Sequence, residues 1–140
     1  MNTVKFSTKQ LNILVEIMRG LGDTVCALSL LKGVRYLYPN ARLTVLCKMN
    51  AGRDIIESSR IPVDEIIVLD VYKDIYITYK TILNLRKHHF DIGISAGITP
   101  VKKSKLFMKL CGVKKHIGFQ ASGTNKYDYD IHFVEANVIT

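Results

Sequence analysis

A glycine-rich loop that ends in an aspartate is the part of the sequence best suited to chemistry. Residues 18–23 read MRGLGD; they follow the short apolar run LNILVEI and precede a long apolar run with helical spacing. Gly20 and Gly22 allow a sharp turn and a close approach of a ligand to the backbone. Asp23 then stands where a helix begins, beside free N–H groups and the positive end of the helix dipole.

Two interpretations of Asp23 are open. The first is structural, because aspartate is among the best N-cap residues and such a cap stabilises a helix by about 1 kcal/mol. The second is catalytic, because a carboxylate that the dipole keeps ionised at neutral pH can accept a proton from a ligand hydroxyl as a general base. The two roles can coexist in one side chain.

The same loop is a poor dinucleotide site. The GxGxxG fingerprint requires a third glycine where Val25 stands, and the acidic residue expected after the second strand is replaced by Cys47, Lys48 and Met49. Asp23 would also repel an anion. We therefore expect no bound cofactor.

A basic segment without Asp or Glu runs from Ile92 to Tyr127. Its lysines are Lys102, Lys103, Lys105, Lys109, Lys114, Lys115 and Lys126. Lys102, Lys105 and Lys109 recur at i, i+3 and i+7, on one face of a helix, whereas Ser104, Phe107 and Cys111 lie toward another. The segment is either a cationic rim for a phosphorylated or acidic ligand, which Lys48 and Arg53 would extend, or an ordinary solvated face.

Composition narrows the class of protein. The chain has 140 residues and a formal charge of +8, which suits one domain and favours anionic partners. The three cysteines, Cys26, Cys47 and Cys111, lie far apart in apolar runs without CxxC spacing. We expect buried, reduced thiols in a cytoplasmic protein, with no disulfide framework and no metal site.

Short β-rich runs alternate with helical patterns and must position these residues. Strands are expected at 11–17, 42–47, 64–70, 90–95 and 115–119, and helices at 24–38, 51–59, within 74–89 and at 101–111. The alternation predicts an α/β fold, a Rossmann-like parallel sheet with helices on both faces, as a single domain over residues 1–140. Ligands bind beyond the carboxyl ends of such strands, so the loops after the first and fourth strands should open on the same edge.

The ordered series of motifs resembles glycosyltransferase family 9, the heptosyltransferase-type enzymes of lipopolysaccharide core assembly. ILVEIMRGLGDTVCALSLLKGVRYLYPNARLTVLC is similar to the family's opening, with Gly22 and Asp23 in its Gly-Asp motif and Pro39 and Ala41 before its second strand. VDEIIVLD and FDIGISAGITPVKKSKLFMKLCGVKKHIGF are similar to its third and fourth strands with the segments around them. IHFVEANVIT resembles the segment that ends the family's N-terminal domain.

This resemblance implies the acceptor-side, N-terminal half of a two-domain (GT-B) enzyme that moves a sugar from a nucleotide-sugar donor with inversion and without a metal. It implies Asp23 as the catalytic base. The candidate acceptor-binding residues are Gly20, Gly22, Lys48, Lys102, Lys103 and Lys105. The chain stops where the second domain would begin, so we expect the donor site on another domain or polypeptide and an inactive isolated half.

The implied acceptor is an acidic or phosphorylated glycan or lipid, which adds the expectation of peripheral contact with the inner membrane surface. The main alternative is a stand-alone α/β binding module for phosphorylated or anionic ligands. A phospho-receiver module, with Asp70 at the end of the third strand, is a weaker one. A nucleic-acid partner is not expected, because no RNP-type aromatic pattern, zinc knuckle or helix-turn-helix signature accompanies the lysines.

Two smaller expectations concern other polar and aromatic residues. Tyr72, Tyr76 and Tyr79 have the spacing of one helix face and are expected to pack in the core. His116 stands alone in the sequence and is expected to be a structural, hydrogen-bonded histidine.

Overall fold

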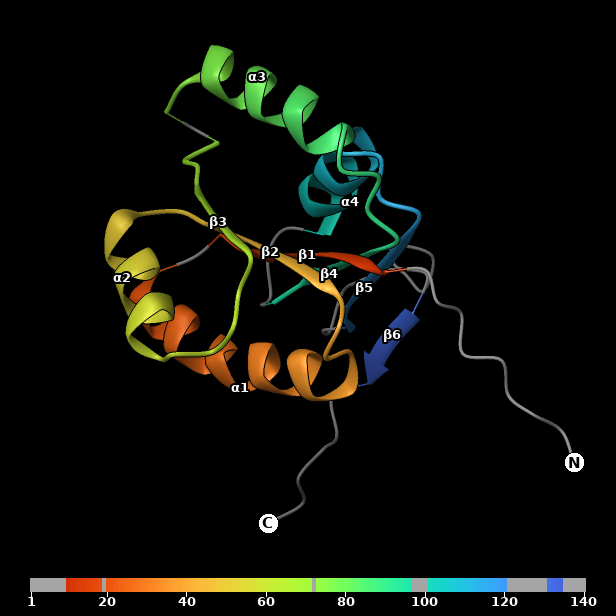
Figure 1. Ribbon diagram of the computed structural model, residues 1–140. Coiled ribbons are helices and arrows are strands. Elements are labelled where there is room, and N and C mark those ends of the chain that lie inside the picture. The colour runs from red at the N-terminus through yellow and green to blue at the C-terminus, as the bar shows by residue number, and fades with distance from the viewer. Residues whose placement is uncertain (1–9, 19, 72, 97–100, 121–130, 135–140) are drawn as a thin grey trace, which may run out of the picture.

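A computed structural model describes residues 10–18, 20–71, 73–96, 101–120 and 131–134 and has a parallel sheet between two layers of helices (Figure 1). The strands are β1 (Asn12–Ile17), β2 (Arg42–Cys47), β3 (Glu65–Val68), β4 (Ile92–Ser95), β5 (Lys115–Gln120) and β6 (Ile131–Val134). The helices are α1 (Leu21–Leu37), α2 (Asn50–Ser58), α3 (Ile75–Arg86) and α4 (Val101–Leu110). The predicted α/β fold class is confirmed, and β6 is a strand that the sequence pattern did not predict.

The strand order of the sheet is β3-β2-β1-β4-β5-β6, and every neighbouring pair is parallel. The chain runs outward from β1 to β3 and then returns past β1 to β4, so α1 and α2 cover one face and α3 and α4 the other (Figure 1). The order reverses between β1 and β4, which marks the ligand edge of such sheets. Receiver-type domains have the order 2-1-3-4-5, so the phospho-receiver alternative is wrong.

Strand β1 distributes its side chains between two separate cores. Ile13, Val15 and Ile17 are fully buried in the core beneath α1 and α2. Leu14 is buried in the core on the other face, beneath α3 and α4. Since strand residues alternate between faces, Glu16 lies on the same side as Leu14.

Helix α4 packs unusually close to the sheet at Gly93 of β4. A Cβ atom at that position would lie 2.8 Å from Cγ1 of Val113 and 2.9 Å from Sδ of Met108. Both distances are shorter than van der Waals contact, so only glycine fits without a shift of its neighbours. Gly93 thereby sets how closely α4 approaches β4.

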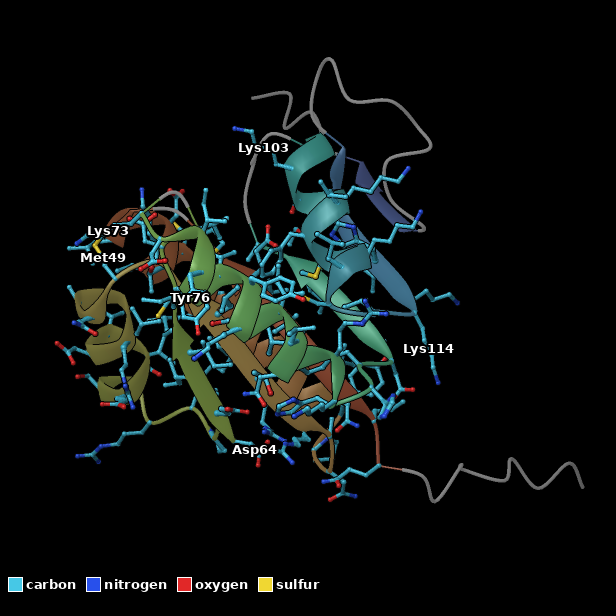
Figure 2. All side chains as sticks on the ribbon, turned by 90° about the horizontal axis from the view of Figure 1, so that it is seen from above. Met49, Asp64, Lys73, Tyr76, Lys103 and Lys114 are labelled. Atoms are coloured by element: carbon cyan, nitrogen blue, oxygen red, sulfur yellow. The ribbon has the colours of Figure 1, made fainter. Side chains whose placement is uncertain are left out.

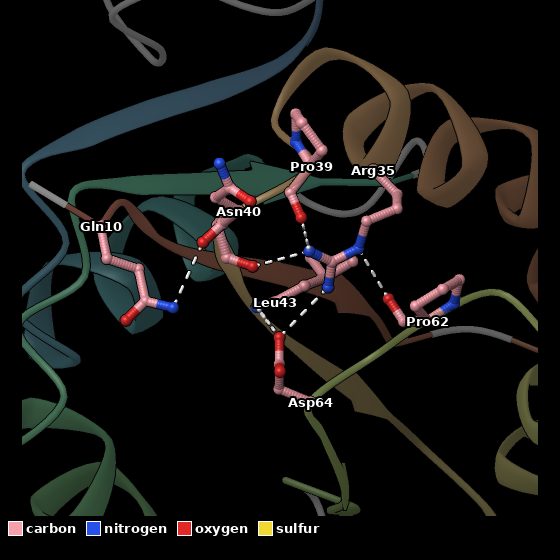
Figure 3. Close-up of polar contacts among 8 residues, drawn as sticks. Gln10, Arg35, Pro39, Asn40, Leu43, Pro62 and Asp64 are labelled. Atoms are coloured by element: carbon pink, nitrogen blue, oxygen red, sulfur yellow. Dashed lines mark hydrogen bonds and ion pairs between the residues drawn. The ribbon is translucent and has the colours of Figure 1, made fainter. Parts of the chain in front are cut away.

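An arginine clamp holds the amino edge of the sheet, far from the carboxyl ends (Figure 3). Arg35 donates to the carbonyl oxygens of Pro62 (2.8 Å), Pro39 (3.1 Å) and Ala41 (2.7 Å), and to the Asp64 carboxylate at 3.1 Å. Asp64 also accepts a bond of 2.7 Å from the N–H of Leu43. Partial burial would raise the pKa of Asp64, but these partners outweigh it and hold that pKa below its usual value.

Two expectations about burial are wrong. Tyr76 and Tyr79 are 65% and 59% exposed on α3, because Thr78 and Leu85 are the α3 residues that turn toward the sheet. Tyr72 lies outside the described residues. Cys26 is exposed on α1, whereas Cys47 and Cys111 are buried as expected. Among the described residues, no helix has the length and apolar character needed to cross a membrane.

Candidate functional site

Asp23 lies in the first turn of α1 but does not cap it. The helix begins at Leu21, three residues earlier than predicted, and its N-cap is Gly20, which offers no side-chain bond. The N-cap interpretation of Asp23 is therefore wrong. Its side chain is exposed and stands in the first turn, where the helix dipole favours a negative charge.

Thr24 fixes the rotation of α1 that leaves Asp23 outside. The Thr24 side chain is buried, and both its N–H and its Oγ1 hydroxyl donate to the carbonyl oxygen of Gly20, at 3.2 and 3.3 Å. It also lies against α2, since a Cβ at Gly52 would be 3.4 Å from its Oγ1. With Thr24 turned inward, the neighbouring Asp23 projects into solvent.

The two loop glycines leave open space beside that carboxylate. Gly20 has an ordinary extended backbone, with φ −68° and ψ −179°, and Gly22 is helical without a positive φ. The expected sharp turn is therefore not the reason for glycine here. A Cβ at either position would meet nothing within 4 Å. Because glycine has no side chain, both residues leave the surface next to Asp23 open.

The predicted lysines lie on elements that begin at the same edge of the sheet. Figure 2 shows Met49, Lys73 and Lys103 toward this edge, and Asp64 and Lys114 toward the opposite one. Lys48 is half-buried directly after β2, and Lys103 and Lys105 are exposed on α4. The side chain of Lys102 lies outside the described part of the chain.

The edge brings these residues together only in part. Helices α1 and α4 both start at the carboxyl ends of strands, but they cover opposite faces of the sheet. Ser104, Phe107 and Cys111, which the helical spacing placed on another face than the lysines, are buried. Arg53, a predicted extension of the rim, forms an ion pair with Glu57 at 3.1 Å.

A buried polar cluster that the sequence patterns did not predict lies beneath this edge. Glu16 of β1 is only 3% exposed and accepts a hydrogen bond from the hydroxyl of Ser104. The Oγ of Ser95 lies 2.8 Å from that of Ser104, 2.7 Å from Nε2 of His116 and 3.5 Å from Oε1 of Glu16. Four polar side chains from β1, β4, α4 and β5 thus form one group between the sheet and α4.

Burial dominates the electrostatics of this cluster. It raises the pKa of Glu16 from 4.5 to about 7, although the bonds from Ser104 and Ser95 act in the opposite direction. Burial also raises the pKa of Cys111 to about 12, with a further contribution from Glu16 that Arg86 partly offsets. The sequence contained one sign of this cluster, the charged Glu16 inside the apolar run LNILVEI. A buried carboxyl group requires hydrogen-bonding partners. His116 is buried and hydrogen-bonded, as predicted for a structural histidine.

Within the described part of the chain, no three His, Cys, Asp or Glu side chains are grouped so that they could hold one metal ion. The described edge offers an exposed carboxylate, exposed lysines and open glycine surface. Such a set suits proton transfer from a hydroxyl and the binding of anionic groups.

No protein-family model and no curated protein sequence matches the chain. Among solved structures, the chain is similar to the glycosyl transferase family 9 protein from Veillonella parvula DSM 2008, with a TM-score of 0.58 and 17% sequence identity. The match covers 82% of this chain and 33% of that one, so this chain corresponds to about a third of that protein's length. The similarity shows that the Rossmann-like fold predicted from the sequence also occurs in a protein of that description.

Proposed function

We propose that the chain is the acceptor-side portion of a family 9-type glycosyltransferase. The observation that supports this most directly is the position of Asp23, exposed in the first turn of α1 at the edge where the strand order reverses between β1 and β4. The fold similarity to a family 9 structure and the ordered sequence motifs support the same assignment.

In the proposed reaction, an acceptor hydroxyl lies over Gly20 and Gly22 and donates a hydrogen bond to Asp23. As the acceptor oxygen bonds to the anomeric carbon of the donor sugar, its proton passes to the Asp23 carboxylate. The bond from the anomeric carbon to the phosphate oxygen breaks, and the nucleoside diphosphate leaves with the electron pair. Attack opposite to the leaving group inverts the anomeric centre. A second domain or polypeptide supplies the donor site.

The lysines at the same edge would bind the anionic groups of the acceptor. Lys103 and Lys105 are exposed, and α4 contains no acidic residue. A lysine acts as a point charge and suits phosphates or carboxylates without a fixed geometry. If the acceptor is a lipid-linked glycan, this charge also brings the protein to an anionic inner membrane surface.

The general-base role is tested by Asp23→Asn, assayed for sugar transfer with the donor-side domain or polypeptide supplied. Loss of a general base lowers kcat by about 10²- to 10⁴-fold. The free energy of unfolding should change by no more than about 1 kcal/mol, since Asp23 only interacts with the helix dipole. Asp54→Asn on α2, another exposed aspartate, is the matched control and should retain full transfer. Unchanged turnover in Asp23→Asn would rule out the base role.

Calorimetric titration of the chain separates this proposal from a stand-alone binding module. We expect binding of an acidic or phosphorylated glycan and none of a nucleotide sugar, whose site lies elsewhere in the proposed enzyme. Charge reversal of Lys103 and Lys105 to Glu should weaken acceptor binding about tenfold or more at low salt. Lys32→Glu, on exposed α1 surface, is the control and should bind as the parent does. Tight binding of the nucleotide sugar would contradict the acceptor-side assignment.

A further inference from the structure

The buried cluster of Glu16, Ser104, Ser95 and His116 has a geometry that goes beyond packing. Glu16 pairs with Ser95 across β1 and β4, the two strands between which the sheet order reverses. Ser104 reaches the pair from α4, and His116 reaches it from β5. The contacts form a continuous series from the Glu16 carboxyl group through two hydroxyls to an imidazole nitrogen.

If each of the three short contacts, from Glu16 to Ser104, from Ser104 to Ser95 and from Ser95 to His116, holds one proton, the series has two arrangements. A serine hydroxyl has one proton, so a serine that donates to one neighbour in the series must accept from the other. In the first arrangement, protonated Glu16 donates to Ser104, Ser104 to Ser95, and Ser95 to Nε2 of His116. In the second, every bond is reversed, His116 donates from Nε2, and Glu16 is a carboxylate.

We propose that Glu16, Ser104, Ser95 and His116 share one exchangeable proton and that this hydrogen-bonded chain positions α4 at the carboxyl edge of the sheet. Passage between the two arrangements breaks the O–H bond of Glu16 and forms an N–H bond at His116, while each serine passes on one proton and receives another. A carboxylic acid and a neutral imidazole become a carboxylate and an imidazolium. The pair stays neutral overall, which is what a buried site requires.

The surroundings of Glu16 support a shared proton rather than a fixed ion pair. Ser95 from β4 and Ser104 from α4 contact Glu16, and His116 from β5 reaches it through Ser95. Cys111, the residue after α4, interacts with it electrostatically. Arg86 at the end of α3 acts electrostatically on Cys111. The raised pKa of Glu16 agrees with a proton that is retained up to neutral pH.

Loss of the shared proton should loosen α4. Above pH 7 the Glu16 carboxylate would be buried without a compensating charge. This would destabilise the packing of α4 against β1, which Ser104 and Glu16 join. Helix α4 carries Lys103 and Lys105, so its position decides where these charges stand at the edge. The four residues are therefore positioning residues, and this inference does not depend on sugar transfer.

The test follows the ring nitrogens of His116 by NMR through a pH titration, in the full chain without any ligand. In the parent, the His116 signals should change together with the ionisation of Glu16. Glu16→Gln, which keeps the shape and removes the titration, should abolish that change. Ser95→Ala keeps both titrating ends and removes the hydroxyl that contacts His116, so Glu16 and His116 should then titrate independently. Glu57→Gln, at an exposed glutamate of α2, is the control and should behave as the parent.

Amide hydrogen exchange gives the second readout. After correction for the intrinsic rate, protection of α4 amides in the parent should fall by up to about tenfold per pH unit between pH 4.5 and pH 7 and stay constant above pH 7, while α1 amides keep theirs. In Glu16→Gln, α4 protection should be independent of pH. The proposal is overturned if His116 titrates identically in the parent and in Glu16→Gln, or if coupling persists in Ser95→Ala. These outcomes leave the role of Asp23 untouched, because no transfer assay is involved.

Discussion

Asp23 and Glu16 are two carboxylates on either side of one glycine loop, and they have opposite environments. Asp23 projects into solvent from the first turn of α1, on the side of the sheet where Ile13, Val15 and Ile17 are buried. Glu16 is enclosed between the sheet and α4, where two hydroxyls reach it. They lie seven positions apart in the sequence.

The difference shows that two carboxyl groups of the same chemistry can have different roles. The face of the strand or helix on which each one lies decides which role it has. Glu16 faces α4 because β1 residues alternate between faces, and Asp23 faces solvent because Thr24 turns inward. The exposed carboxylate can meet a ligand, whereas the buried one can only act on the protein around it. Three predictions test this contrast.

The largest expected effect is a loss of stability as the pH rises. The pKa of Glu16 is about 7 in the folded chain against 4.5 when unfolded, so the folded state binds its proton more tightly. The resulting stabilisation is fully present below pH 4.5, declines above it and is lost above pH 7. Its size is on the order of 3 kcal/mol.

Urea unfolding across this pH range measures the effect, and Glu16→Gln should remove it. Asp64 changes stability in the opposite direction and at lower pH, because its lowered pKa favours the folded state above that range. The two contributions are therefore separable. If the parent and Glu16→Gln lose the same stability between pH 4.5 and pH 7, the two carboxylates do not differ as described.

A smaller effect is expected from Gly93→Ala. The added methyl group would push against Val113 and Met108 and move α4 away from β4. Overpacking of this kind costs about 1–3 kcal/mol, and the shift should also stretch the bond from Ser104 to Glu16. Thermal unfolding measures the first effect, and the Glu16 titration by NMR measures the second. A parent-like titration in Gly93→Ala would mean that the close approach of α4 is not needed for the buried cluster.

The smallest change in stability is expected from Gly22→Ala. Alanine favours a helix by up to about 1 kcal/mol over glycine, and nothing obstructs a Cβ at this position. The variant should therefore be at least as stable as the parent, yet bind an acidic acceptor more weakly, because the methyl group stands beside Asp23. Gly33→Ala, in the same helix and equally open, should gain stability without any loss of binding. Equal binding by both variants would show that the space next to Asp23 is not used.

The sequence predicted the fold well because apolar runs and breakers are local signals. Five of the six strands and all four helices in the described part of the chain were expected close to where they lie, and the parallel order follows from their alternation. The predicted start of helix α1 was too late, because Gly20 and Gly22 indicated a loop. In the structure Gly20 is the N-cap and Gly22 is helical. Strand β6 was missed within a polar tail.

The candidate site was predicted only in part, because burial depends on neighbours that sequence spacing does not reveal. The helical period correctly separated Ser104 from the lysine face of its helix, but the same reasoning buried Tyr76 and Tyr79, which are exposed. The buried cluster joins residues from positions 16 to 116, and only the parallel register of β1, β4 and β5 brings them together. A charged residue in an apolar strand was the one local sign of it.

The exposure of Cys26 has a practical consequence for observing ligand binding. This thiol lies one helical turn beyond Asp23, and the other two cysteines, Cys47 and Cys111, are buried. A thiol-reactive fluorophore should therefore attach selectively at Cys26 and report, through its emission, when a sugar occupies the surface beside the first turn of α1.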